Sequence, residues 1–96
     1  MRRRRPDRLE LYESATYVAL QEALAANVRR ARASLGLTQE AAAHACGMSA
    51  RLLQRVEAAD VNPTLITLAR LSGGLGLDAT ALLQRSATPA DDPAVP

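Results

Sequence analysis

Residues 38–57 constrain the fold more than any other part of this 96-residue chain, because two helical patterns there flank a single glycine. Thr38 can cap a first helix, after which small and apolar residues recur at helical spacing. Gly47 supplies the left-handed backbone that ends a helix, and Ser49 can cap a second helix that extends through Val56. The segment therefore predicts two short helices joined by a tight turn.

The second of these helices has one apolar side and one side rich in hydrogen-bond donors. Its inward stripe consists of Leu53 and Val56. The outward positions are Ala50, Arg51, Gln54, Arg55 and Ala58. The major groove of DNA can admit a helix whose exposed side carries hydrogen-bond donors between small side chains. The pattern therefore predicts a helix that reads base edges.

Further motifs stand in a fixed order around this segment. They are LGLTQ at residues 35–39, the small residue Ala43, Gly47, the apolar Met48, Ser49, RVE at 55–57, NPTLITLARL at 62–71 and LGLDATALL at 75–83. With these motifs, residues from about 24 to 83 resemble the five-helix DNA-binding domain of the Cro, phage-repressor and XRE-type regulators. The resemblance implies an all-α, lambda-repressor-like helix-turn-helix domain. In that family the third helix enters the major groove, usually in a two-fold dimer on a near-palindromic operator.

The resemblance also assigns the residues that touch DNA. It places Arg51, Gln54 and Arg55 nearest the bases, and the start of their helix adds Ser49 and Ala50. Arginine pairs with guanine and glutamine with adenine, and a good bidentate pair contributes about 1 to 3 kcal/mol of discrimination. Phosphate contacts are expected on both sides of this helix, where they set position rather than sequence. The residues expected to make them are Thr38, Gln39, Asn62 and Thr64.

Two further residues have a structural role in the resembled fold. An arginine at the Arg32 position packs there beside a glutamate at the Glu57 position. This implies a partly buried ion pair that fixes the first domain helix to the end of the recognition helix. The alternative is an exposed carboxylate near the DNA, which is disfavoured because a carboxylate facing phosphate opposes binding.

Four consecutive arginines stand near the start of the chain. Arg2, Arg3, Arg4 and Arg5 can follow the minor groove or the phosphates, adding a salt-dependent contribution of about one counterion per contact. The alternative is a cluster that only raises solubility. The formal net charge of the chain is only +2, so without the arginines the domain is almost neutral. A protein that approaches a polyanion usually carries positive charge, which favours a DNA-contacting arm.

The chain divides into a basic arm with a helical extension at 1–19, the helix-turn-helix domain at 20–86 and a disordered, proline-rich tail at 87–96. A helix that begins near Leu9 either runs into the first domain helix or breaks near Leu20.

The fourth domain helix is expected to begin after Thr64 as its cap. Its predicted buried stripe consists of Leu65, Leu68 and Leu71. A glycine pair at 73–74 then requires the helix either to fray or to be held by close packing.

A homodimer is expected, because so small a leucine-based core is near the lower limit for independent stability. The expected dimer surface is the last helix, capped by Asp78, with the end of the helix before it. Its residues are Leu75, Leu82 and Leu83. The rival surface is the N-terminal extension, with Leu9, Leu11, Tyr12 and Tyr17. The same extension supports a second hypothesis, a protein-interaction adaptor or antitoxin-like component with a protein partner and weak or secondary DNA binding.

Several classes of protein are excluded by residue types. Lysine is absent, so neither a Walker phosphate loop nor a Schiff-base site can be built. His44 and Cys46 point to nearly opposite sides of a helix, so they cannot share a metal ion. No apolar run approaches the roughly 18 residues needed to span a bilayer. We therefore expect a cytoplasmic, non-enzymatic protein without a cofactor, a metal or a membrane partner.

Overall fold

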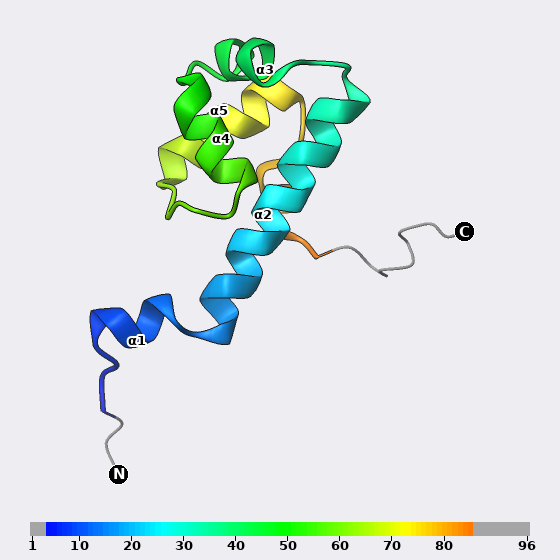
Figure 1. Cartoon of the computed structure of the whole chain (residues 1–96). Coiled ribbons are helices and arrows are strands. Elements are labelled where there is room, and N and C mark those ends of the chain that lie inside the picture. The colour runs from blue at the N-terminus through cyan, green and yellow to red at the C-terminus, as the bar shows by residue number, and fades with distance from the viewer. Residues whose placement is uncertain (1–3, 86–96) are drawn as a thin grey trace.

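The computed structural model describes residues 4–85, and every element within that range is helical. The α-helices are α1 (Arg8–Tyr12), α2 (Ala15–Ser34), α3 (Gln39–Ala45), α4 (Ala50–Glu57) and α5 (Leu65–Leu75), and a 3-10 helix, η1 (Ala79–Leu83), follows them. Figure 1 shows α3, α4 and α5 gathered around one end of α2, with α1 set apart at the other end. The all-α prediction is confirmed. The predicted tail at 87–96, together with Arg2 and Arg3, lies outside the described residues.

The helices begin where hydroxyl or carboxylate side chains satisfy their first free amides. Thr38 accepts a hydrogen bond from the backbone N–H of Ala41, and Ser49 accepts one from Leu52, each at 3.0 Å. The cap residues predicted for the last two elements are also in place. Thr64 caps α5, and Asp78 accepts from the N–H of Thr80 at 2.8 Å.

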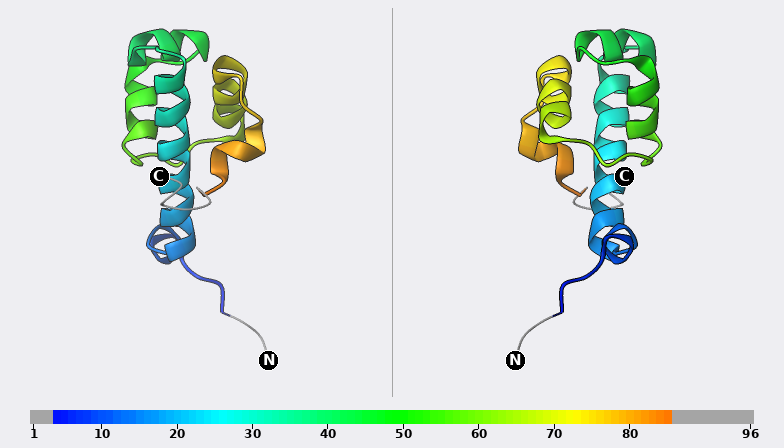
Figure 2. Two further views of the ribbon diagram at one scale, coloured as in Figure 1. Left: turned by 90° about the vertical axis from the view of Figure 1, so that its right-hand side faces the viewer. Right: turned by 90° about the vertical axis from the view of Figure 1, so that its left-hand side faces the viewer.

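The core lies between α2 and the elements on its two sides. Figure 2 shows α2 between the α3–α4 pair on one side and α5 with η1 on the other. Its largest fully buried side chains are Val28, Leu53, Val56, Leu71 and Leu82. Each of α2, α4, α5 and η1 contributes at least one of them, so these four elements hold the domain together.

Burial corrects the dimer surface predicted from the sequence. Leu75 is 5% exposed and Leu82 is fully buried, because both side chains pack into the core of their own chain. Neither is therefore available to a second subunit. Leu83 alone of the predicted trio stays half-buried and accessible.

Helix α2 begins at Ala15, before the predicted boundary near Leu20. The break between α1 and α2 falls at Glu13 and Ser14, where the Ser14 hydroxyl accepts from the N–H of Tyr17 at 3.1 Å. A single serine cap therefore sets this boundary, whereas the apolar periodicity continues across it.

Helix α5 runs without interruption through its two glycines and ends at Gly76, whose φ of +72° is left-handed. Close packing explains why it does not fray. A Cβ atom on Gly74 would lie 2.7 Å from Cys46 Cα and 2.8 Å from the Ala45 carbonyl oxygen. Of the two alternatives open from the sequence, packing is the one realised.

The start of α5 faces solvent rather than the core. Leu65 is 84% exposed and Ile66 is 63% exposed, whereas Leu71 is fully buried. The predicted inward position of Leu65 is wrong, because burial on α5 begins only farther along the helix, at Leu71 and Leu75. None of the helices within residues 4–85 combines the length and apolar character required to cross a membrane.

Candidate nucleic-acid interface

Helix α4 presents Arg51 and Gln54 on its exposed side, one helical turn apart. Neither side chain forms a hydrogen bond or ion pair with any residue in the described range 4–85. The opposite side of the helix is buried through Leu53, Val56 and Glu57. The helix is therefore fixed on one face and offers unoccupied donors on the other.

The side chain of Arg55, unlike those of Arg51 and Gln54, forms a polar contact with another of the described residues, Asp60. Arg55 Nε donates to the carbonyl oxygen of Asp60 at 3.1 Å and lies 3.9 Å from the Asp60 carboxylate. Both side chains are mostly exposed, so this contact is weak and a stronger anion can displace it. The structure thus places Arg55 toward the loop that follows α4.

The first residues of α4 have structural roles. Ser49 uses its hydroxyl as the N-cap, and Ala50 is half-buried against the core. Thr38 and Thr64 use their hydroxyls in the same way at the starts of α3 and α5.

The other two predicted phosphate contacts have partners inside the protein. Gln39 Nε2 donates to Glu57 Oε1 at 2.9 Å. Asn62 Nδ2 donates to the hydroxyl oxygen of Tyr12 at 3.3 Å, which links the loop after α4 to the N-terminal extension.

Arg32 and Glu57 form a bidentate ion pair at the C-terminal end of α4. Arg32 Nε lies 2.7 Å from Glu57 Oε2, and Arg32 Nη2 lies 3.0 Å from Oε1. With the bond from Gln39, three donors converge on one carboxylate that is only 6% exposed. The contact therefore joins α2, α3 and α4 at a single point.

Two opposing effects act on the Glu57 carboxyl. Burial raises its pKa, but the hydrogen bonds from Arg32 and Gln39 and the Arg32 charge outweigh burial, so the pKa lies below its ordinary value of 4.5. The same carboxylate raises the pKa of Arg32. Both groups are therefore charged over the whole physiological range.

Three further polar links, which no sequence pattern predicted, join the elements around α4. Arg29 Nη1 donates to the backbone oxygen of Glu57 at 2.6 Å and so caps the end of α4. Arg70 Nη1 donates to the carbonyl oxygen of Gly47 at 2.7 Å. No short-range pattern identifies such contacts, because each joins residues more than twenty positions apart.

Asn27 is the third of these links. Its side-chain amide donates to the carbonyl oxygens of Ala81, Leu82 and Gln84 at 3.1, 2.8 and 2.8 Å. One amide thereby fastens η1 to α2, which keeps Leu82 in the core.

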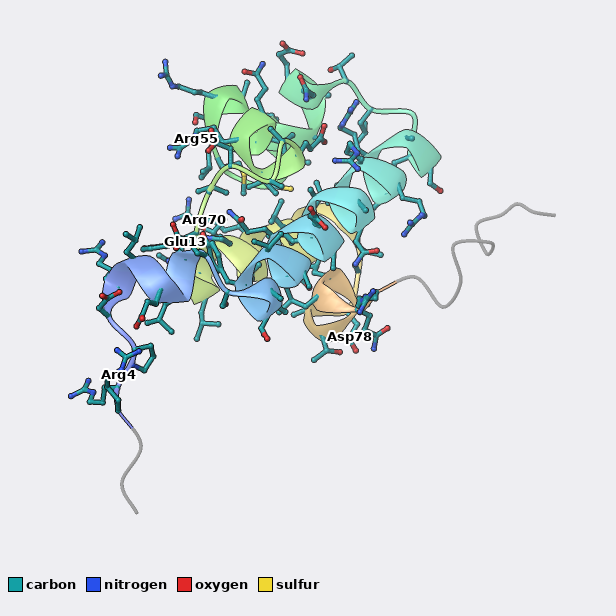
Figure 3. All side chains as sticks on the ribbon, turned by 60° about the horizontal axis from the view of Figure 1, so that its bottom comes forward. Arg4, Glu13, Arg55, Arg70 and Asp78 are labelled. Carbon is teal, nitrogen blue, oxygen red and sulfur yellow. The ribbon has the colours of Figure 1, made fainter. Side chains whose placement is uncertain are left out.

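Aromatic contacts join α1 to the start of α2. Tyr12 and Tyr17 pack edge to face with ring centroids 5.1 Å apart, and the Arg8 guanidinium lies 5.8 Å from the Tyr12 ring centroid. Arg4 pairs with Glu10 at 3.0 Å, with both side chains exposed. Figure 3 shows Arg4 far from Arg55, near the start of the extension.

A shallow apolar groove of about 150 Å³ lies between α2, the loop before α5 and η1. It is lined by Tyr17, Leu20, Gln21, Leu24, Asn62, Pro63, Leu68 and Leu83. Within residues 4–85, no three His, Cys, Asp or Glu side chains come close enough to hold a metal ion.

Comparisons with known proteins agree with this geometry. The family model described as Helix-turn-helix, HTH_3, matches residues 28–82. A hypothetical transcription factor from Neisseria, NHTF, has a similar crystal structure, with a TM-score of 0.71 and 28% identity over 78% of this chain and 84% of that one. No curated protein sequence matches the chain significantly.

A second similar crystal structure is that of an HTH_3 family transcriptional regulator from Vibrio cholerae. Its TM-score is 0.65 and its identity 29%, over 69% of this chain and 37% of that longer chain. The matched family model spans more than half of the present sequence, from the middle of α2 to η1. The resemblance drawn from the sequence is thus confirmed, and the chain belongs to the XRE-type helix-turn-helix family, HTH_3.

Proposed function

We propose that the chain is a transcriptional regulator that acts in the cytoplasm and binds an operator through the exposed face of α4. The observation that carries the proposal is that Arg51 and Gln54 lie side by side on one exposed face of α4. Both are exposed, without partners among residues 4–85, on a helix whose other face is buried. A guanidinium and a carboxamide at this spacing match guanine and adenine edges in the major groove.

The remaining contacts follow from the family pattern. Arg55 is expected to leave Asp60 for a base or a phosphate, since their exposed contact is weak. Ser49 and Ala50 lie at the start of the reading helix, and phosphate contacts are proposed at Thr38, Gln39, Asn62 and Thr64. Arg2, Arg3, Arg4 and Arg5 are proposed to add phosphate or minor-groove contacts.

A binding titration with two arginine variants tests the proposal. Affinity for the upstream DNA of the protein's own gene, and for unrelated DNA of equal length, is measured at two salt concentrations. Arg51→Ala is expected to weaken operator binding by about 5- to 150-fold and to spare binding to unrelated DNA. Arg85→Ala removes the same charge from a residue next to η1, away from α4, and serves as the matched control. Equal operator affinity of the two variants would contradict the proposal.

We further propose that the protein binds as a homodimer, with its two α4 helices about 34 Å apart, and lowers transcription. The apolar groove supports this, because exposed apolar side chains adjoin it in sequence. These are Leu65 and Ile66, which follow Pro63 closely in the sequence, while the exposed Leu20 and the half-buried Leu83 line the groove itself.

Sedimentation and a reporter gene test the dimer and the direction of regulation. Leu65→Glu should yield monomers, whereas Leu35→Glu changes another exposed leucine, at the C-terminal end of α2, and should leave the dimer intact. Expression of a reporter placed behind the operator should rise when the gene for this protein is deleted. A wild-type monomer at all concentrations, or a fall in expression, would refute the corresponding part of the proposal.

A second candidate is an adaptor or antitoxin-like component that binds a protein partner. It is favoured by α1, which buries none of its residues and exposes Leu9 and Leu11. Under this alternative, wild type and Arg51→Ala would bind all DNA equally weakly.

A further inference from the structure

Helix α5 contacts the end of α3 and the turn that follows it at two points. Arg70 Nη1 donates to the Gly47 carbonyl oxygen at 2.7 Å. Gly74 lies so close to Cys46 that a Cβ atom there would be 2.7 Å from Cys46 Cα and 2.8 Å from the Ala45 carbonyl oxygen. Figure 1 shows the C-terminal half of α5 passing beneath α3.

The two contacts lie on one face of α5, because Arg70 and Gly74 are four residues apart and so nearly one turn apart. The glycine allows the helix backbone to approach, and the arginine then reaches the turn. Close packing and a polar bond therefore act on the same short piece of chain.

The turn at Gly47 determines the direction in which α4 leaves α3. Gly47 has a left-handed φ of +66°, and the N–H of Met48 returns to the Ala43 carbonyl oxygen at 3.0 Å. The N–H of Gly47 donates to the His44 carbonyl oxygen at 3.1 Å, so both amides are satisfied. In the described part of the chain, Arg70 is the one side chain that donates to the Gly47 carbonyl.

We propose that Arg70 is a positioning residue for DNA reading, which acts through Gly47 on the direction of α4 and not by touching DNA itself. The inference rests on the proposed function. A guanidinium suits this role because its donors are fixed in a plane, whereas a lysine ammonium places one charge on a flexible stem. Small rotations of α4 about the turn would move Arg51 and Gln54 together relative to the base edges.

The main rival role for an exposed arginine at this place is a direct phosphate contact. The two roles differ in their salt dependence. Removing a phosphate contact lowers the slope of log affinity against log salt by about one. Removing a positioning contact leaves that slope unchanged and lowers the ratio of operator affinity to affinity for unrelated DNA.

The experiment compares Arg70→Ala, Arg70→Lys and the control Arg85→Ala in the full chain. For Arg70→Ala we expect a loss of about five- to tenfold in the operator ratio, with no change in salt slope. Arg70→Lys should recover only part of the ratio. Arg85→Ala should alter neither quantity.

Amide hydrogen exchange at Met48 provides a readout that does not depend on DNA. Arg70→Ala should speed exchange there while exchange at Val28 in the core stays as in wild type. If wild type shows no operator preference, the proposed function fails, and the Met48 exchange still decides whether Arg70 holds the turn. Unchanged exchange, an unchanged operator ratio or a salt slope reduced by about one would each overturn the proposal. Should Arg70→Ala not fold, Arg70→Lys is judged by the same three outcomes.

Discussion

Replacing Glu57 with glutamine tests the contact that joins α2, α3 and α4. The carboxylate accepts two hydrogen bonds from Arg32, at 2.7 and 3.0 Å, and one from Gln39 at 2.9 Å. Glutamine keeps the shape but turns one acceptor into a donor, so at least one donor faces another donor. It also leaves the Arg32 charge without its counter-ion.

The magnitude follows from burial. Breaking a buried ion pair by removing one partner destabilises a protein by roughly 3 to 5 kcal/mol. The Arg32 side chain keeps 23% of its surface exposed, and water can partly replace the lost carboxylate. We therefore expect the lower end, about 3 kcal/mol, which for a domain of this size lowers Tm by about 12 to 24 °C.

The assay is thermal and urea unfolding followed by far-ultraviolet circular dichroism. Glu22→Gln makes the same chemical change at an exposed position on α2 and should alter the free energy of unfolding by less than about 0.5 kcal/mol. A double-mutant cycle with Arg32→Gln should show that the two single losses do not add, because both remove the same pair. A loss below about 1 kcal/mol for Glu57→Gln would refute the reasoning, since surface ion pairs already account for that much.

Three further predictions concern pH, helix α5 and η1. Because the folded pKa of Glu57 lies below 4.5, its stabilisation is present above that pH and is lost as pH falls below it. Acid unfolding of Glu57→Gln should therefore depend less steeply on pH than that of wild type, and parallel curves would contradict this. Gly73→Ala, where a Cβ meets no atom within 4 Å, should stabilise the protein by about 0.5 to 1 kcal/mol, whereas Gly74→Ala should destabilise it. Equal effects in thermal unfolding would disprove the close approach of α5. Asn27→Asp exchanges the amide that serves three carbonyl oxygens for a carboxylate and should cost about 2 kcal/mol in urea unfolding. A stability equal to that of wild type would rule out this link.

The parts of the fold that sequence predicted are those governed by local chemistry. The caps Thr38, Ser49, Thr64 and Asp78 all stand where a short polar side chain meets the first free amides of a helix. Gly47 lies in the left-handed region that the turn needs. Such features depend on a few neighbouring residues, so they can be read without knowing the tertiary structure.

The parts that sequence did not predict depend on contacts across the chain. Leu65 in α5 and Leu82 in η1 are both leucines in apolar segments of the sequence, yet Leu65 is 84% exposed and Leu82 is fully buried. Periodicity identifies an apolar side of a helix but not the length over which another helix covers it. The start of α2 was misplaced for a related reason, because the Ser14 cap breaks a stripe that otherwise continues.

The candidate site shows the same division. Helical spacing predicted the shared exposure of Arg51 and Gln54 on one side of α4, and the family resemblance predicted the ion pair of Arg32 with Glu57. Arg29 and Arg70 were missed, since each donates to a backbone oxygen that any residue type provides. Because every residue has a backbone carbonyl, the sequence does not indicate which one accepts such a bond.

Cys46 packs against Gly74 of α5, so its thiol is a natural reporter of the contact between α3 and α5. Cys46 is the single cysteine of the sequence, it is almost fully buried, and burial raises the pKa of its thiol. A thiol reagent can therefore modify it only when α5 separates from α3, so the alkylation rate reports how often the domain opens. The sequence has no Trp or Phe, and both tyrosines, Tyr12 and Tyr17, lie at the N-terminal end, so near-ultraviolet absorbance follows that end alone. Opening of the domain and release of the extension can thus be timed separately in one protein of unaltered sequence.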